Sequence, residues 1–133
     1  MSKNKNLWIV KPANMSRGRG IYIIDDVSEV QLDDNAIISK YVDNPLLLNG
    51  HKFDLRLYVC ITSYEPLRIY IYQEGLVRFA SEKYTLTDAK TNLFNQLTNY
   101  SINKKNVNFV KNEGLDKDDE GFKWSLTAFI KHL

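Results

Sequence analysis

The sequence predicts an α+β protein whose chain is mostly antiparallel β-sheet, with a C-terminal helix packed on that sheet. Residues 52–62 alternate between apolar and polar side chains, which is the period of a β-strand. Residues 67–72 alternate in the same way after a proline-containing turn at 63–66, so the two segments form a predicted hairpin. Apolar residues in the last ten positions, beginning at Trp124, recur at helical spacing and favour an amphipathic helix.

The N-terminal segment predicts two short strands joined by a basic loop. Residues 7–10 form a continuous apolar run that ends at Lys11 and Pro12, and residues 21–24 form a second apolar run. The connection at 13–20 contains two glycines and two arginines. Glycine lets backbone N–H groups approach phosphate oxygens, and basic side chains neutralise their charge. The loop is therefore a candidate phosphate cradle, although a flexible hairpin with solvated arginines has the same pattern, and neither the P-loop nor the dinucleotide-binding pattern is present.

The next elements lead to the central strand. Residues 27–30 predict a helical turn, and residues 36–42 predict a third strand whose last residues expose backbone groups at a sheet edge. The strand predicted at 51–62 then has two different faces. We expect the apolar face to lie in the core, and it contains Phe53, Leu55, Leu57, Val59 and Ile61. The other face carries Lys52, Asp54, Arg56 and Tyr58 and is either a binding surface or the solvated face of an ordinary strand.

The C-terminal half adds a third strand to this sheet. After a turn at Glu74 and Gly75, residues 76–79 form a strand that brings Arg78 toward the central one. Residues 97–104 predict a polar loop, and residues 113–121 predict a solvated acidic turn. Trp124 is expected to anchor the predicted C-terminal helix in the core.

Composition limits the classes of function. A chain of 133 residues with 44% hydrophobic residues is long enough for one domain with its own core. No apolar run approaches the roughly 20 residues of a membrane helix, and one cysteine, Cys60, forms no internal disulfide, so we expect an intracellular protein. The net charge of +2 is a small surplus for a nucleic-acid binder, although five basic residues and no acid lie in positions 1–20. His51 and His132 have no partner at zinc-ligand spacing.

Seven short motifs occur in an order and at spacings that resemble the tubulin tyrosine ligase-like family, and its polyglutamylase branch most of all. They are Trp-Ile-Val-Lys-Pro at 8–12, Ser-Arg-Gly-Arg-Gly-Ile at 16–21, Pro-Leu-Leu-Leu at 45–48, Lys-Phe-Asp-Leu-Arg at 52–56, Glu-Gly-Leu-Val-Arg-Phe at 74–79, Leu-Thr-Asn-Tyr-Ser at 97–101 and Lys-Trp-Ser-Leu at 123–126. Each motif alone has low specificity, but together they cover nearly the whole chain.

The resemblance implies an ATP-grasp ligase in which ATP lies between two α+β lobes. Such an enzyme phosphorylates an acceptor carboxylate, and the amine of an incoming amino acid attacks the acylphosphate to form an amide. In the polyglutamylase branch the amino acid is free glutamate and the acceptor is a glutamate side chain in the acidic tail of tubulin or another protein. The implied cofactors are ATP and Mg²⁺, and the implied location is the cytoplasm, on microtubules or in a cilium or basal body, with no nucleic-acid or membrane partner.

The resemblance also assigns candidate nucleotide-binding residues. Lys11 matches the lysine that holds the ATP phosphates, and Arg17 with Gly18 matches the loop that closes over them. The strand that binds adenine in the family is matched here by Ser39, Lys40, Tyr41 and Val42. Many relatives have Gln at the position of Ser39. Further nucleotide contacts match Lys52, Asp54, Thr98 and Asn99. Lys52 is also a candidate catalytic residue, as is Arg56, which shares its face and is the candidate for stabilising the acylphosphate.

Four residues match contacts to the incoming glutamate: Arg78, Tyr100, Ser101 and Lys123. A guanidinium suits a carboxylate because its planar fork donates two parallel hydrogen bonds, although Arg78 could instead cap the surface of the sheet. Where many relatives read His-Leu-Thr-Asn, this chain reads Gln96-Leu97-Thr98-Asn99, so the role of the histidine is not transferred.

The family's Mg²⁺ ligands, an Asp and a later Glu-x-Asn, are expected beyond residue 133, and part of the nucleotide-binding lobe is expected before Met1. The acids at 116–120 are a weak substitute. We therefore expect residues 1–133 to be a partial catalytic domain with little activity alone. Three alternatives remain: a noncatalytic module that binds nucleotide or the tubulin tail, a tubulin glycylase or tyrosine ligase, and a nucleic-acid binder based only on basic and aromatic residues.

Overall fold

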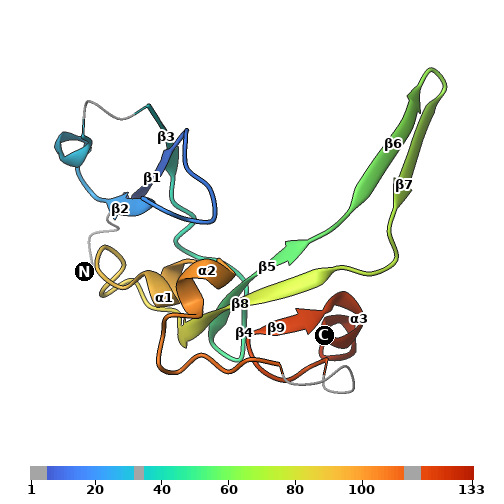
Figure 1. Cartoon of the computed structure of the whole chain (residues 1–133). Coiled ribbons are helices and arrows are strands. Elements are labelled where there is room, and N and C mark those ends of the chain that lie inside the picture. The colour runs from blue at the N-terminus through green and yellow to red at the C-terminus, as the bar shows by residue number, and fades with distance from the viewer. Residues whose placement is uncertain (1–5, 32–34, 113–117) are drawn as a thin grey trace.

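The computed structural model describes residues 6–31, 35–112 and 118–133, and it contains three sheets (Figure 1). A three-stranded sheet has the order β2-β1-β3, a four-stranded sheet has the order β4-β5-β8-β9, and β6 and β7 form a two-stranded arm. The helices α1 (Leu93–Gln96) and α2 (Tyr100–Asn103) lie between the first two sheets, whereas the arm extends away from the rest of the chain (Figure 1). The predicted class, mostly antiparallel sheet with a C-terminal helix, is confirmed.

The three-stranded sheet forms as predicted from its apolar runs. It contains β1 (Trp8–Pro12), β2 (Tyr22–Ile24) and β3 (Ala36–Lys40), and Ile9 lies opposite both Ile23 and Ser39. Apolar side chains from this sheet pack against residues near α1, and the cluster contains Leu7, Ile9, Ile23, Tyr41, Ala89 and Leu97. The predicted helical turn at 27–30 is a 3₁₀ turn, Val27–Glu29, with a capping box from Asp26.

The third strand ends two residues earlier than predicted. The segment expected at 36–42 pairs with β1 only as far as Lys40, and β3 is an edge strand. The backbone N–H of Tyr41 still bonds to the Leu7 carbonyl, at 2.8 Å, but the Tyr41 side chain is buried and Val42 is 66% exposed. The inward turn of Tyr41 ends the strand there.

The four-stranded sheet holds the second core. It contains β4 (Leu47–Leu48), β5 (His51–Arg56), β8 (Leu76–Lys83) and β9 (Lys123–Ser125). Aromatic side chains fill the space beside it, with ring centroids 4.9 Å apart in both Phe53–Phe129 and Phe79–Trp124. Such pairs stabilise a core beyond the area that they bury. Val77 is fully buried among them.

An irregularity in β8 separates two regions of regular pairing with β5. His51 lies opposite Lys83 and Phe53 lies opposite Phe79, so three residues of β8 face one residue of β5. The extra residues do not continue the ladder. Instead, the backbone N–H of Ser81 donates to Oδ1 of Asn103 at 2.8 Å, and the Asn103 side chain is buried. Asn103 in turn donates to the carbonyls of Leu97 and Asn99, so it ties the segment before α2 to β8.

The central strand predicted at 51–62 is two strands. Pairing with β8 ends at Arg56, and β6 (Val59–Tyr64) pairs instead with β7 (Leu67–Ile71), so the predicted hairpin is confirmed but the continuous strand is wrong. The apolar face predicted to be core is also wrong beyond Phe53. The exposed fractions are 44% for Leu55, 45% for Leu57, 56% for Val59 and 47% for Ile61. Alternation predicts which side chains share a face, but it does not predict what covers that face.

The C-terminal prediction is correct in kind and wrong in its boundary. Trp124 belongs to β9, and α3 (Leu126–Lys131) begins only after Ser125, whose hydroxyl caps the helix by accepting from the Ala128 N–H at 3.0 Å. The loop predicted at 97–104 contains α2, a single turn of helix that begins after Asn99. Of the predicted acidic turn, residues 113–117 lie outside the described residues. No helix among the described residues has the length and apolar character that crossing a membrane requires.

Candidate functional site

Lys52 lies where the two larger sheets approach each other. Its ammonium donates a hydrogen bond of 2.8 Å to the hydroxyl of Tyr41 and lies 4.5 Å from the centre of the Tyr41 ring. The centre of the Tyr84 ring, which directly follows β8 in the same sheet as Lys52, is 5.8 Å away. Burial lowers the pKa of Lys52 to about 8, opposed by attraction to Asp54 and assisted by repulsion from Lys11. The two predicted phosphate-binding lysines are therefore close enough for the charge of Lys11 to lower the pKa of Lys52.

Asp54 and Arg78 form an ion pair across neighbouring strands. They are opposite each other in the β5–β8 register, and Nε of Arg78 donates to Oδ1 of Asp54 at 2.8 Å while Nη2 donates to Oδ2. The hydrogen bond to Asp54 raises the pKa of Arg78. The two side chains are 31% and 39% exposed, so the pair borders solvent. The structure thus pairs Asp54, which the sequence assigned to the nucleotide, with Arg78, which it assigned to glutamate. To bind glutamate, the Arg78 guanidinium must either bind Asp54 and the substrate together or release Asp54.

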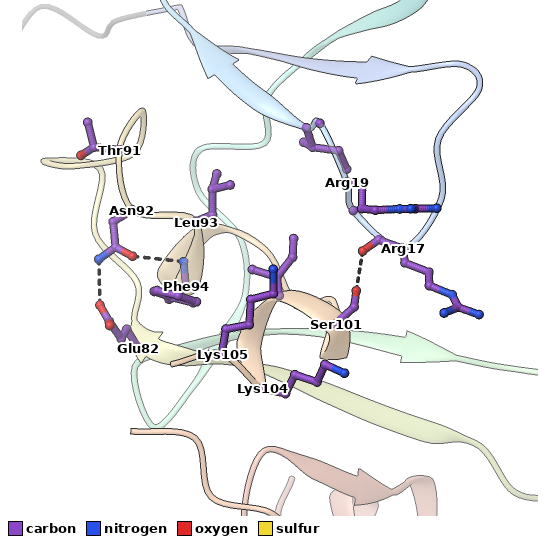
Figure 2. A pocket seen from close by; sticks show the side chains of 14 residues that line it. Arg17, Arg19, Glu82, Thr91, Asn92, Leu93, Phe94, Ser101, Lys104 and Lys105 are labelled. Atoms are coloured by element: carbon purple, nitrogen blue, oxygen red, sulfur yellow. Dashed lines mark hydrogen bonds between the residues drawn. The ribbon is translucent and has the colours of Figure 1, made fainter. Parts of the chain in front are cut away.

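The basic loop rests against the start of α2. The Ser101 hydroxyl donates to the backbone carbonyl of Arg17, a contact visible in Figure 2. Gly18 has a φ of +79°, and a Cβ at this position would lie 2.7 Å from Cδ1 of Ile102 and 3.0 Å from Cγ of Asn99. Only glycine fits both the backbone conformation and the close approach. Four of the predicted site residues, Arg17, Gly18, Asn99 and Ser101, are therefore neighbours.

Two cavities border α2. The first, about 710 Å³ in volume, is lined by four of the predicted site residues, namely Arg78, Thr98, Tyr100 and Lys123, together with aromatic side chains that include Phe109 and Trp124. The second, about 910 Å³, lies beneath the basic loop and is lined by Arg17, Arg19, Ser101, Lys104 and Lys105 (Figure 2). The four predicted glutamate contacts are thus divided between the cavities. Arg78, Tyr100 and Lys123 line the first cavity, whereas Ser101 lines the second.

Four predicted site residues, Ser39, Lys40, Val42 and Arg56, have no described contact with the Lys52 site and do not line either cavity. Ser39 and Lys40 lie on the edge strand β3, which agrees with the expectation of accessible backbone groups at a sheet edge. Val42 is exposed beyond its end. Arg56 lies at the end of β5 with its guanidinium 5.6 Å from the Tyr58 ring, so its catalytic role stays a prediction.

Sequence reasoning missed a buried amide network. Gln96 and Asn95 in α1 are 0% and 1% exposed, and each has hydrogen-bond partners within the core. The Gln96 side chain accepts from the Tyr41 hydroxyl at 2.6 Å, so it is a neighbour of the Lys52 site. A local signal for α1 was present before the predicted polar loop, since Asn92 stands at the N-cap of α1 and its side chain accepts from the Phe94 N–H at 3.1 Å.

Comparisons with known proteins agree over the whole chain. The model of the tubulin-tyrosine ligase family matches residues 1–133. Human tubulin polyglutamylase TTLL5 is 48% identical over 134 residues, which cover 99% of this chain and 10% of the relative. Human probable tubulin polyglutamylase TTLL2 is 48% identical over 126 residues, or 95% of this chain and 21% of the relative. Mouse tubulin monoglutamylase TTLL4 is 44% identical over 133 residues, or 99% of this chain and 11% of the relative.

The chain therefore spans between a tenth and about a fifth of the length of these curated relatives. Within that span the matched region includes the Lys52 site, the Asp54–Arg78 pair and both cavities. On this match over its full length, the chain belongs to the tubulin-tyrosine ligase family.

Proposed function

We propose that the protein containing this chain is an ATP-dependent ligase that adds glutamate to glutamate side chains of an acidic protein tail, such as that of tubulin. Residues 1–133 would form part of its catalytic domain, which has the ATP-grasp-like fold of the family. One observation carries the proposal: the half-buried Lys52 is electrostatically coupled to Lys11 and to Asp54, and Asp54 is hydrogen-bonded to Arg78, which lines a cavity together with Lys123. All the reactants are anions, so the site must concentrate cations. Similar relatives are named tubulin polyglutamylases and a monoglutamylase.

The hydrogen-bonding groups between the three-stranded and four-stranded sheets fit a nucleoside triphosphate. Lys11 and Lys52 supply two ammonium groups for phosphate oxygens, and the edge strand β3 offers backbone groups to a planar base. When bound, ATP supplies the phosphoryl group that activates the acceptor carboxylate. Among residues 6–31, 35–112 and 118–133 there is no group of three or more His, Cys, Asp or Glu side chains that could hold a metal ion, so we assign Mg²⁺ to none of them.

The cavity of about 710 Å³ suits a dicarboxylic amino acid. Arg78 and Lys123 lie opposite each other in the β8–β9 register, and both line the cavity. Two cations on one wall can bind the two carboxylates of glutamate, while the Tyr100 hydroxyl can orient its amine. Glycine lacks the second carboxylate, and this difference favours glutamate over glycine as the donor.

The basic cavity in Figure 2 suits the acidic acceptor. Arg17, Arg19, Lys104 and Lys105 line it, and its one carboxylate, Glu82, accepts hydrogen bonds from Asn92 and Asn106. Reversing two charges with Lys104→Glu and Lys105→Glu should raise the KM for an acidic peptide acceptor about tenfold or more, because like charges now face each other. The KM for ATP should not change. Steady-state kinetics with the complete protein measure both, and the exposed pair Arg68→Glu and Lys131→Glu is the matched control. An equal effect in the control would assign the change to overall charge.

ATP affinity should depend on pH through Lys52. Because burial lowers the pKa of Lys52 to about 8, its ammonium is mostly charged at pH 7 and mostly neutral at pH 9. Phosphate binds the charged form, so affinity is highest below the pKa and falls as the pH rises through it. The fall between pH 7 and pH 9 should be up to about tenfold. Calorimetric titrations at several pH values measure it, and the same series on Lys52→Met should be nearly flat. A parallel fall in that variant would assign the pH dependence to another group.

The proposal as a whole is tested by incorporation of labelled glutamate into peptides with tubulin-like acidic tails, by the complete protein, with and without ATP. We expect ATP-dependent incorporation that labelled glycine and tyrosine do not reproduce. Incorporation of glycine or tyrosine instead would identify a glycylase or a tyrosine ligase. Binding of ATP or of the acidic peptide without incorporation of any amino acid would support a noncatalytic binding module and overturn the ligase proposal.

A further inference from the structure

The hydrogen bond from Lys52 to Tyr41 is the first in a chain of hydrogen bonds through the core. Lys52 donates to the Tyr41 hydroxyl oxygen at 2.8 Å, and that hydroxyl donates to Oε1 of Gln96 at 2.6 Å. Nε2 of Gln96 donates to the Thr85 carbonyl and to Oδ1 of Asn95, both at 2.6 Å. Three of these residues come from separate parts of the fold: Lys52 from β5, Tyr41 from the position after β3, and Gln96 from α1.

The direction of this chain is fixed at its far end. The Thr85 carbonyl can only accept a hydrogen bond, so the amide group of Gln96 must point its nitrogen there and its oxygen toward Tyr41. Asn95 is held in the same way, because its Nδ2 donates to the Asp88 carboxylate at 2.9 Å and leaves its oxygen as an acceptor. The Asp88 carboxylate is therefore the terminal acceptor of the network, and the two amides have one permitted orientation.

The fixed amides determine what Tyr41 presents to Lys52. Burial raises the pKa of Tyr41, so its hydroxyl keeps its proton, and that proton is directed to Gln96. The lone pairs of the phenol oxygen are then left for the ammonium of Lys52. The Gln96 side chain is 0% exposed and keeps its hydrogen bonds, so its oxygen stays directed at the Tyr41 hydroxyl.

We propose that Gln96 is a positioning residue for Lys52: by accepting the Tyr41 hydroxyl proton, it makes the phenol oxygen an acceptor that holds the lysine ammonium in place for a phosphate group. Gln96 acts only through Tyr41 and touches no substrate. The inference rests on the proposed function, in which Lys52 contacts a nucleotide phosphate.

A double-mutant cycle tests this dependence, because a residue that acts through another has no effect once the other is removed. Tyr41→Phe removes the hydroxyl and keeps the ring, and Gln96→Met removes the acceptor at similar volume. Each single variant should weaken ATP binding about tenfold, since a hydrogen bond to a charged group is lost or misdirected. The double variant should bind no more weakly than Tyr41→Phe alone. Additive losses would overturn the inference, because they indicate separate structural effects.

A second readout follows Lys52 itself. The groups that face its ammonium are Tyr41, Tyr84, Asp54 and Lys11, and of these only Tyr41 is changed in the cycle. Losing the acceptor disfavours the ammonium, so the pKa of Lys52, measured by NMR on labelled lysine, should fall further in both single variants. Tyr64→Phe, at an exposed position of the arm, is the control and should change neither the pKa of Lys52 nor ATP affinity.

A second substitution at position 96 tests the inference if Gln96→Met does not fold. Burial keeps the carboxyl of Gln96→Glu neutral, so its carbonyl oxygen still accepts from Tyr41 while its hydroxyl donates to the Thr85 carbonyl, and ATP affinity should stay within about threefold of the parent protein. A loss as large as that of Tyr41→Phe would overturn the inference. The outcomes also separate this inference from the proposed function. If Lys52→Met leaves ATP affinity unchanged, the proposed nucleotide site itself is wrong. If Lys52→Met weakens ATP binding strongly but the losses of Tyr41→Phe and Gln96→Met are additive, only the assignment of Gln96 is overturned.

Discussion

Replacing Lys52 with methionine is expected to weaken ATP binding about 50-fold without loss of stability. Removing one partner of a hydrogen-bonded charge pair costs about 2 to 3 kcal/mol, which is the source of the affinity loss. The folded protein, by contrast, loses a desolvated ammonium and gains an unbranched apolar side chain between the rings of Tyr41 and Tyr84. The free energy of unfolding should therefore stay the same or rise.

Calorimetry with ATP and urea unfolding measure these two quantities on the same samples. Lys131→Met is the matched control, because Lys131 is exposed in the last turn of α3, away from the lysine pair. The control should leave affinity unchanged. Lower affinity accompanied by an equal loss of stability would contradict the expectation, because it would indicate that Lys52 supports the fold and does not bind the nucleotide.

Replacing Arg78 with methionine should lower kcat/KM for glutamate about 100-fold in the complete protein, because one carboxylate of the amino acid loses its guanidinium partner. The unfolding free energy should fall by only about 1 kcal/mol, since the Asp54–Arg78 pair borders solvent. A large kinetic effect with a small structural one distinguishes a substrate ligand from a residue that merely caps the sheet.

Arg78→Lys refines the same test. Lysine keeps the charge and one contact to Asp54 but lacks the planar fork, so the KM for glutamate should rise about tenfold while the KM for ATP does not change. Initial rates at varied glutamate and varied ATP separate the two constants. If Arg78→Lys and Arg78→Met lose stability without any change in the KM for glutamate, Arg78 caps the sheet and the amino-acid site lies elsewhere.

The strands near Lys11 and at residues 67–71 could be predicted because their signal is local. The apolar run before Lys11 and the alternation in residues 67–71 depend only on neighbouring residues, and both form the strands expected of them. The break between Arg56 and Val59 could not be predicted in this way. It arises because β5 pairs with β8 whereas β6 pairs with β7, and a change of partner leaves the alternation of side chains unaltered.

The sequence predicted which residues belong to the candidate site better than it predicted how they pair with one another. The motifs around Lys11 and Lys52 indicated two phosphate-binding lysines, and in the structure the charge of Lys11 lowers the pKa of Lys52. The pairing of Asp54 with Arg78 depends on cross-strand register, which the sequence does not specify. Gln96 was missed for a related reason: its partners, Tyr41 and Thr85, come from separate parts of the chain, so no local pattern marks it as buried.

The irregularity in β8 has an evolutionary consequence. Ser81 leaves the ladder and is bound by Asn103, which also binds the backbone of Leu97 and Asn99, so one amide replaces the missing strand contacts and fixes the segment before α2. An insertion or deletion between Phe79 and Lys83 would move Ser81 away from Asn103 and orphan both groups. Among homologues, the length of this stretch should therefore be invariant and positions 81 and 103 should covary, which an alignment of the family can test. Independent variation at the two positions would contradict this constraint.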